Sequence, residues 1–310
     1  MNILFMGTPD FALEAIKVLD ESKHNVLGAV TQPDKPKGRG HKMVAPPVKE
    51  YALEHDIPVY QPNTLKNGEL KEVLDELKPD IIVVAAYGKI LPNYVIDYPK
   101  YGCINIHASL LPKYRGAAPI QYSVLNGDKK TGVTIMQMDY GLDTGDMIMV
   151  KETEIGEYET SGELFDRLAV LGGEALIEVL DVIEQGRAER VKQGDDFTYA
   201  SMISKDMAKI DWNKSVNEIS NLVRGMNPWP LAFTSYKGEV MKIIEARIAD
   251  NNSDGQNGEV LGYQKGTGLL VKCGEGVLTV TKVQFTGGKK LPIDDYLRGH
   301  EIETGTILGE

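Results

Sequence analysis

The first half of the chain is predicted to form an α/β domain, and the last third is predicted to form a smaller β-rich domain. In the first half, near-continuous apolar runs alternate with amphipathic helical patterns, which is typical of a mostly parallel sheet covered on both faces. After residue 225 the apolar runs become short and β-rich, and clusters of Gly, Asn and Asp separate them. Short strands at this spacing are typical of a small barrel. We therefore expect a Rossmann-like N-terminal domain and a C-terminal β-barrel of the OB-like kind.

Each element of the first half has its own signal. The expected strands are apolar stretches bounded by polar residues or glycine: 2–6, 26–31, 81–87, 102–107 and 131–138. The expected helices carry apolar residues at helical spacing: 11–19, 48–55, 68–77, 118–125 and 163–185. Asp10 can cap the first of these helices, and Thr160 or Ser161 can cap the last.

The second half has a different pattern. Residues 186–205 are polar and lack a clear period, so we expect a connecting segment there. One helix is expected at 216–224, followed by strands at 233–236, 240–249, 259–264, 269–272 and 277–285. These patterns predict an N-terminal domain at 1–189, a linker at 190–205 and a C-terminal domain at 206–310.

Composition excludes several classes of protein. With 42% hydrophobic and 25% charged residues, the chain is typical of globular proteins. Its two cysteines, Cys103 and Cys273, are too far apart in sequence for a disulfide framework or a paired-cysteine zinc site, so a reducing cytoplasm is expected. The longest apolar run, 81–87, is far shorter than the roughly 20 residues of a membrane span, and no signal peptide is predicted.

Charge is distributed unevenly. The net charge is -11, yet residues 34–49 hold five basic residues and one acidic residue, Asp34. This basic segment could be an ordinary solvated loop. It could also contact phosphate groups, because Gly38 and Gly40 give flexible flanks to Arg39 while prolines restrict both ends. The overall negative charge therefore does not exclude a nucleic-acid partner.

The common nucleotide and metal motifs are missing. Only Gly7 follows the first expected strand, where a dinucleotide-binding fold places three glycines. No P-loop and no HExxH motif occurs, and neither histidines nor thiols recur at ligand spacing. We expect no dinucleotide cofactor and no metal.

Asn105, His107 and Asp143 are the candidate catalytic residues. Asn105 and His107 alternate at the end of an expected parallel strand, so both side chains share the face that opens toward the ligand crevice. Asp143 lies in a glycine-punctuated loop after another strand, from which its carboxylate could reach His107. Asn105 can donate to a developing oxyanion, and Asp143 can orient His107 and take up a proton. Without an activated Ser or Cys, these residues suit acyl transfer that has no covalent enzyme intermediate.

The chain resembles the folate-dependent formyltransferase family over its whole length. The resemblance is carried by residues 6–12, 31–34, 38–40, 86–92, 105–112, 115–121, 132–146 and 227–230. The basic segment and the β-rich C-terminal domain narrow it to members that act on tRNA. The resemblance implies that a formyl group passes from 10-formyltetrahydrofolate to the amino group of initiator methionyl-tRNA, for translation initiation. Residues 1–189 would then be the catalytic domain, and residues 206–310 would bind the tRNA body.

The resemblance also implies roles for individual residues. Folate would be bound by one segment after the expected strand 102–107 and enclosed by two others: Ser109, Leu110, Leu111 and Pro112; Ile90, Leu91 and Pro92; Asp139, Tyr140 and Gly141. The acceptor end of the tRNA would be contacted by Lys35, Lys37, Arg39 and Lys42. We expect a monomer.

Two alternatives share these residues. A formyltransferase acting on a small amine, such as a sugar nucleotide or glycinamide ribonucleotide, would use the same catalytic segment. A non-enzymatic RNA-binding protein could retain an inactive α/β domain, although the intact Asn105, His107 and Asp143 argue against it. Binding of charged tRNA would distinguish a tRNA formyltransferase from an enzyme that acts on a small amine. Binding of folate would distinguish it from a non-enzymatic RNA-binding protein.

Overall fold

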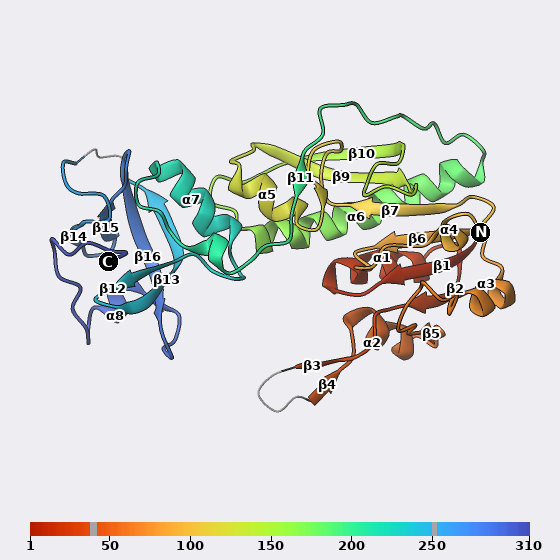
Figure 1. The fold of residues 1–310 in the computed structure, drawn as a ribbon, viewed down its shortest axis with the longest axis horizontal. Coiled ribbons are helices and arrows are strands. Elements are labelled where there is room, and N and C mark those ends of the chain that lie inside the picture. Colours follow the sequence, from red (N-terminus) through yellow and green to blue (C-terminus); the bar gives the residue numbers. More distant parts are fainter. Residues whose placement is uncertain (38–41, 250–252) are drawn as a thin grey trace. The chain divides into compact units, whose positions relative to one another are not determined.

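A seven-stranded sheet forms the centre of the N-terminal part of the chain (Figure 1). The computed structural model describes residues 1–37, 42–249 and 253–310. It divides the chain into two units, of which the first comprises Met1–Pro119, Thr131–Glu154 and Phe165–Ala200. The second comprises Ile120–Lys130, Ile155–Leu164 and Ser201–Glu310.

The strands of the first sheet follow the order β10-β9-β7-β6-β1-β2-β5. Their bounds are β1 Asn2–Gly7, β2 Asn25–Val30, β5 Val59–Tyr60, β6 Ile81–Ala85, β7 Cys103–His107, β9 Lys130–Gln137 and β10 Met147–Glu154. The pairs β1–β2, β1–β6, β2–β5 and β6–β7 are parallel, and β7–β9 is antiparallel. The sheet is therefore mostly parallel, as predicted.

Apolar side chains account for the central strands. Every residue of β6 is buried, as are residues 3–6 of β1, so these strands form the core of the sheet. The helices of this part of the chain are α1 Asp10–Asp20, α2 Pro47–Glu54, α3 Lys71–Leu77, α4 Asn93–Ile96, α5 Pro119–Leu125 and α6 Ser161–Glu184. In α1 the buried residues recur at helical spacing, which gives that helix one face for the core.

Two short pairs of strands stand outside the main sheet. The predicted basic loop is a hairpin, in which β3 (Lys35–Lys37) pairs antiparallel with β4 (Lys42–Val44). The second pair joins distant segments, because β8 (Arg115–Gly116) pairs parallel with β11 (Tyr199–Ala200). The segment expected to be only a connection thus supplies a strand next to the loop that follows β7.

The second unit contains a separate antiparallel sheet, with the order β12-β13-β16-β15-β14 and β17 paired to β16. The elements of this unit that follow residue 200 are η1 Asp206–Ala208, α7 Val216–Gly225, β12 Phe233–Tyr236, β13 Glu239–Ile248, β14 Val260–Gln264, β15 Gly268–Lys272, β16 Val277–Phe285, β17 Leu291–Pro292 and α8 Ile293–Tyr296. Ser215 and Glu218 form a capping box at the start of α7. This unit has its own apolar core, which includes Trp212, Met241 and Val280.

Candidate active site

The strand order reverses between β1 and β6, because β2 follows β1 on one side and β7 follows β6 on the other. In open α/β sheets, ligands bind outside the carboxyl ends of the strands at such a point. The loops after β6 and β7 carry the predicted residues 90–92 and 109–112. The topology thus brings two of the three predicted folate-binding segments to neighbouring strand ends.

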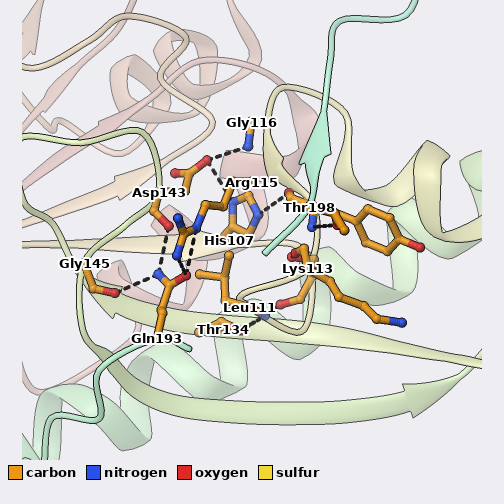
Figure 2. A network of polar contacts seen from close by, with 12 residues as sticks. His107, Leu111, Lys113, Arg115, Gly116, Thr134, Asp143, Gly145, Gln193 and Thr198 are labelled. Atoms are coloured by element: carbon orange, nitrogen blue, oxygen red, sulfur yellow. Dashed lines mark hydrogen bonds and ion pairs between the residues drawn. The ribbon is translucent and has the colours of Figure 1, made fainter. Parts of the chain in front are cut away.

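His107 ends β7, and its two ring nitrogens have different partners. The imidazole is 5% exposed, and its Nε2 lies 2.9 Å from the main-chain oxygen of Tyr114. Because a carbonyl can only accept, Nε2 carries a proton and donates it to Tyr114. The other nitrogen, Nδ1, lies 3.7 Å from Oδ2 of Asp143 (Figure 2). Nδ1 is therefore the ring nitrogen that can gain or lose a proton beside the carboxylate.

Asp143 follows a strand that ends at the opposite end of β7 from His107, so the loop that carries it must turn back. β9 is antiparallel to β7, so its last residue, Gln137, pairs with Ile104 near the start of β7. The loop after β9 must therefore run back toward His107. Gly145 permits the close packing of this loop, because a Cβ there would lie 1.7 Å from the main-chain oxygen of Gln137.

The carboxylate of Asp143 is held from a second side. The main-chain N–H of Gly116 donates to Oδ2 of Asp143 at 2.8 Å. Asp143 itself has a φ of 52°, in the left-handed region that costs a non-glycine residue on the order of 1 kcal/mol. A conformation of that cost persists only where neighbouring contacts hold it. The main chain of this loop therefore needs partners of its own.

The partner of this main chain is Gln193, which the sequence did not single out. The Gln193 amide donates from Nε2 to the main-chain oxygens of Asp143 and Gly145, both at 2.8 Å (Figure 2). Its Oε1 accepts from Nε and a terminal nitrogen of Arg115, at 3.0 and 2.7 Å. Gln193 lies in the polar stretch between the predicted domains, where neither period nor motif marks it.

Asn105 lies in the middle of β7 and is partly exposed. Its main chain pairs with Val84 of β6 and Met136 of β9, which fixes the side chain on the same face of the sheet as His107. Among the residues that the structure describes, none hydrogen-bonds to its side-chain amide. Both amide N–H groups are thus available to an oxygen atom of a ligand.

Of the segment 109–112, the Ser109 hydroxyl is committed within its own loop. It is fully buried and donates to the main-chain oxygen of Lys113 at 2.6 Å. Thr134 ties the same segment to β9, because its hydroxyl donates to Ser109 O and accepts from the N–H of Leu111. Leu111 is buried, whereas Leu110 and Pro112 are partly exposed. Ser109 therefore shapes this loop.

The two other predicted folate-binding segments expose large apolar side chains. Ile90 is 88% exposed and Tyr140 is 65% exposed, whereas Leu91 is buried and anchors its loop. The Tyr140 hydroxyl donates to both carboxylate oxygens of Asp97 at 2.9 Å, which raises the pKa of Tyr140. Asp139 accepts from the N–H of Gly141 and from the Thr144 hydroxyl, so its carboxylate closes its own turn.

Three of the predicted tRNA-contacting residues, Lys35, Lys37 and Lys42, lie on the paired strands β3 and β4. Lys35 is exposed at the start of β3, and Lys37 and Lys42 are paired through their main chains. Arg39 lies outside the described residues. At the root of the hairpin, Lys49 donates to both carboxylate oxygens of Asp34 at 2.8 and 2.9 Å, and Gln61 donates to the same carboxylate. The hydrogen bond from Lys49 is the main reason why the pKa of Asp34 is lowered.

Comparison with known proteins places this chain in a family. Residues 1–180 match the family model described as Formyl transferase, and residues 202–301 match that of the Formyl transferase C-terminal domain. The methionyl-tRNA formyltransferase of Alkaliphilus oremlandii is 49% identical over 311 residues, covering 100% of both chains. That of Clostridium beijerinckii is 52% identical over 309 residues, covering 99% of this chain and 100% of the relative. The chain belongs to the methionyl-tRNA formyltransferase family.

Solved structures extend the likeness to the fold. A methionyl-tRNA formyltransferase from Clostridium thermocellum aligns with a TM-score of 0.55 and 19% identity, covering 81% of this chain and 95% of its own. An N-formyltransferase from Helicobacter canadensis aligns with a TM-score of 0.66 and 20% identity, covering 93% and 99%. At these identities the structural likeness concerns the formyltransferase fold alone.

The described parts of this formyltransferase contain neither a candidate membrane span nor a candidate metal site. No helix within residues 1–37, 42–249 and 253–310 is both long and apolar enough to cross a membrane. Within the same ranges, no group of three or more His, Cys, Asp or Glu residues is arranged to hold a metal ion.

Proposed function

We propose that this chain transfers the formyl group of 10-formyltetrahydrofolate to the amino group of initiator methionyl-tRNA. The observation that carries the proposal is whole-length identity of 49% and 52% to relatives named methionyl-tRNA formyltransferase. The geometry of His107 and Asp143 supports it, because a buried imidazole beside a carboxylate is suited to moving the proton that an attacking amine must lose. The product is N-formylmethionyl-tRNA, which serves translation initiation.

The catalytic residues have distinct roles in this proposal. The net reaction joins the amine nitrogen to the formyl carbon, breaks the bond from that carbon to N10 of the folate and moves one proton from the amine to N10. Asn105 donates from its free amide to the formyl oxygen while negative charge develops there, an interaction typically worth roughly 3–4 kcal/mol. His107 takes the amine proton at Nδ1, because Nε2 is committed to Tyr114. Asp143 orients the ring through its carboxylate.

The exposed apolar side chains suit a flat ring system. Ile90 and Tyr140 are large, exposed and located on two of the loops beside the proposed catalytic residues. We assign the folate to these loops and to residues 109–112, with Leu110, Leu111 and Pro112 as its contacts and Ser109 as the residue that shapes the segment.

The tRNA is assigned to the hairpin and to the C-terminal domain, residues 206–310. Lys35, Lys37, Arg39 and Lys42 concentrate positive charge on a chain whose net charge is -11, so phosphate contact is restricted to a small area. The ion pair of Lys49 with Asp34 fixes the main chain just before β3, on which Lys35 lies. The acceptor end would be recognised through phosphate contacts and unpaired bases.

The similarity of the whole chain to tRNA-modifying relatives supports this function over transfer to a small amine. The N-formyltransferase from Helicobacter canadensis, whose structure contains folinic acid and dTDP-3-aminofucose, is only 20% identical. We further propose that the protein acts in the cytoplasm as a monomer. Both cysteines are free and buried, as expected for a reducing compartment. Light scattering on the purified protein would test the monomer.

The test is a direct assay of product. Purified protein would be incubated with 10-formyltetrahydrofolate and initiator tRNA charged with labelled methionine, and N-formylmethionine would be measured after mild deacylation of the tRNA. The proposal predicts formylation of charged initiator tRNA and none of free methionine. A dTDP-amino sugar and glycinamide ribonucleotide would be tested in parallel. Faster transfer to either small amine than to methionyl-tRNA would overturn the proposal.

A further inference from the structure

We propose that Gln193, which lies between the two predicted domains, is a positioning residue for Asp143. This inference rests on the proposed function, in which Asp143 acts through His107. The side-chain amide of Gln193 bridges two main-chain oxygens of the Asp143 loop on one side and the Arg115 guanidinium on the other (Figure 2).

The guanidinium of Arg115 fixes the orientation of the Gln193 side-chain amide. A guanidinium has donors only, so the atom that it contacts must be the amide oxygen, Oε1. The Nε2 group is then turned toward the carbonyls of Asp143 and Gly145, which can only accept. Arg115 is itself held firmly: it is 7% exposed, and its guanidinium lies 4.5 Å from the centre of the Phe197 ring. The orientation of Gln193 is therefore fixed by its partners.

The Gln193 amide acts on the main chain that sets the Asp143 carboxylate. Asp143 is in the left-handed region, and both of the loop oxygens that Gln193 binds lie within two residues of its Cα. The Gly116 N–H holds one carboxylate oxygen, and Gln193 holds the main chain from which that carboxylate extends. Together they place Oδ2 at 3.7 Å from Nδ1 of His107.

The segment that carries Gln193 is attached at several points to the same unit. Val191 forms an isolated bridge with Met147 of β10. Farther on, the main-chain oxygen of Thr198 accepts from Arg115, and its hydroxyl accepts from the N–H of Tyr114. Tyr114 also supplies the oxygen that binds Nε2 of His107. Residues 191–200 therefore support both partners of the catalytic pair.

The substitution Gln193→Glu tests this role. The introduced carboxylate would keep an oxygen for Arg115 and would even form an ion pair with it, but it would lack the N–H groups and would repel the two carbonyls. A role confined to holding Arg115 would survive this change. We expect the single-turnover rate of transfer to methionyl-tRNA to fall about 10- to 100-fold, because small displacements of catalytic groups have effects of this size. Folate affinity should stay near that of the wild type, and thermal melting would verify that the variant is folded.

A double-mutant comparison decides whether the loss passes through Asp143. In an Asp143→Ala background, Gln193→Glu should change the rate by less than about 3-fold, because residues that act as a unit are strongly non-additive. Gln185→Glu is the matched control, since it adds the same charge at an exposed glutamine just after α6. Gln193→Met, which removes donors and acceptor at similar length, provides a second measurement if Gln193→Glu does not fold.

The outcomes separate this inference from the proposed function. An equal loss in the wild-type and Asp143→Ala backgrounds would overturn it, and so would a wild-type rate in a folded Gln193→Glu protein. A wild-type enzyme that does not formylate methionyl-tRNA would instead refute the proposed function. If Asp143→Ala is impaired and Gln193→Glu is not, the proposed function stands and the positioning role of Gln193 fails.

Discussion

At the scale of single residues, the hydrogen bonds distinguish side chains that hold the loops of the site from side chains that can contact substrate. Ser109 and Asp139 direct their side chains to their own loops. Asn105 has no such partner among the described residues, and His107 keeps one nitrogen beside a carboxylate. Residue type and spacing single out Asn105 and His107, and the family resemblance singles out Ser109 and Asp139. The sequence could not distinguish their roles, because partners within a loop depend on how the loop folds.

Asn105→Ala should lower the single-turnover transfer rate by about 10²- to 10³-fold, the cost of one oxyanion donor. Folding should be little affected, because the Asn105 amide has no described partner to lose and is partly exposed. Rapid quenching with saturating folate and charged tRNA would measure the rate, and thermal melting would check the fold. Asn93→Ala, at an exposed position of α4, is the control. Equal rates for Asn105→Ala and the control would remove Asn105 from the catalytic residues.

At the scale of elements, the strands with apolar runs could be predicted, and those rich in charged residues or proline could not. The strands β1, β2, β6, β7 and β9 lie close to the predicted ranges because their apolar runs report burial on both faces. The strand β10 was not predicted. Its second half alternates exposed and partly buried residues at the edge of the sheet, and the sequence there includes Lys151, Glu152 and Glu154. The hairpin β3–β4 was expected only as a loop, because its prolines and lysines are poor strand formers.

The same limit applies to the candidate site. The sequence indicates Asn105 and His107 from alternation along one strand, and Asp143 from a glycine-rich loop. It gives no indication of Gln193, because the hydrogen bonds of this residue reach across about 50 to 80 positions of sequence. Contacts over such separations follow from topology, here from the pairing of β8 with β11, and have no local pattern.

The hairpin β3–β4 gives a prediction about salt dependence. If its basic residues contact tRNA phosphates, each one removed should reduce the magnitude of the log–log salt slope by about 0.7. Lys35→Ala should show this smaller slope. Arg39→Ala should show it too and should lower the transfer rate more than the other substitutions. Arg39→Lys should restore only part of the transfer rate, because the charge returns without the planar guanidinium. The measurement is the rate of transfer to charged tRNA across a salt series, beside folate affinity. Lys66→Ala, at an exposed position before α3, is the control. Slopes equal to that of the wild type would mean that the hairpin is ordinary surface.

At the scale of the whole molecule, the two units each have a core, and each core buries one cysteine. Cys103 lies in the first core and Cys273 in the second, and both are fully buried. Burial raises the pKa of Cys273 to about 11 and also raises that of Cys103. Neither thiol is therefore a nucleophile at neutral pH, in agreement with a reaction that uses no covalent enzyme intermediate.

These thiols predict how stability depends on pH. In the unfolded chain Cys273 ionises near its ordinary value of 9.0, whereas in the folded protein it ionises near 11. Its contribution is therefore complete below about pH 9 and is lost as the pH rises toward 11, at about 1.4 kcal/mol for each unit of pKa difference. Denaturant unfolding at a series of pH values should show a steeper decline for the wild type than for Cys273→Ala. Parallel declines in the two proteins would contradict this account of Cys273.

The central claim is that His107 and Asp143 move the amine proton during transfer to initiator methionyl-tRNA. Its most direct test is the single-turnover rate for the wild type, His107→Ala and Asp143→Ala, with folate affinity measured on the same preparations. Asp166→Asn, at an exposed position of α6, serves as the control. The account predicts rates lower by about 10² or more in both site variants with folate affinity little changed, because acid–base groups act mainly in the transition state. Near-wild-type transfer by either folded site variant would contradict it.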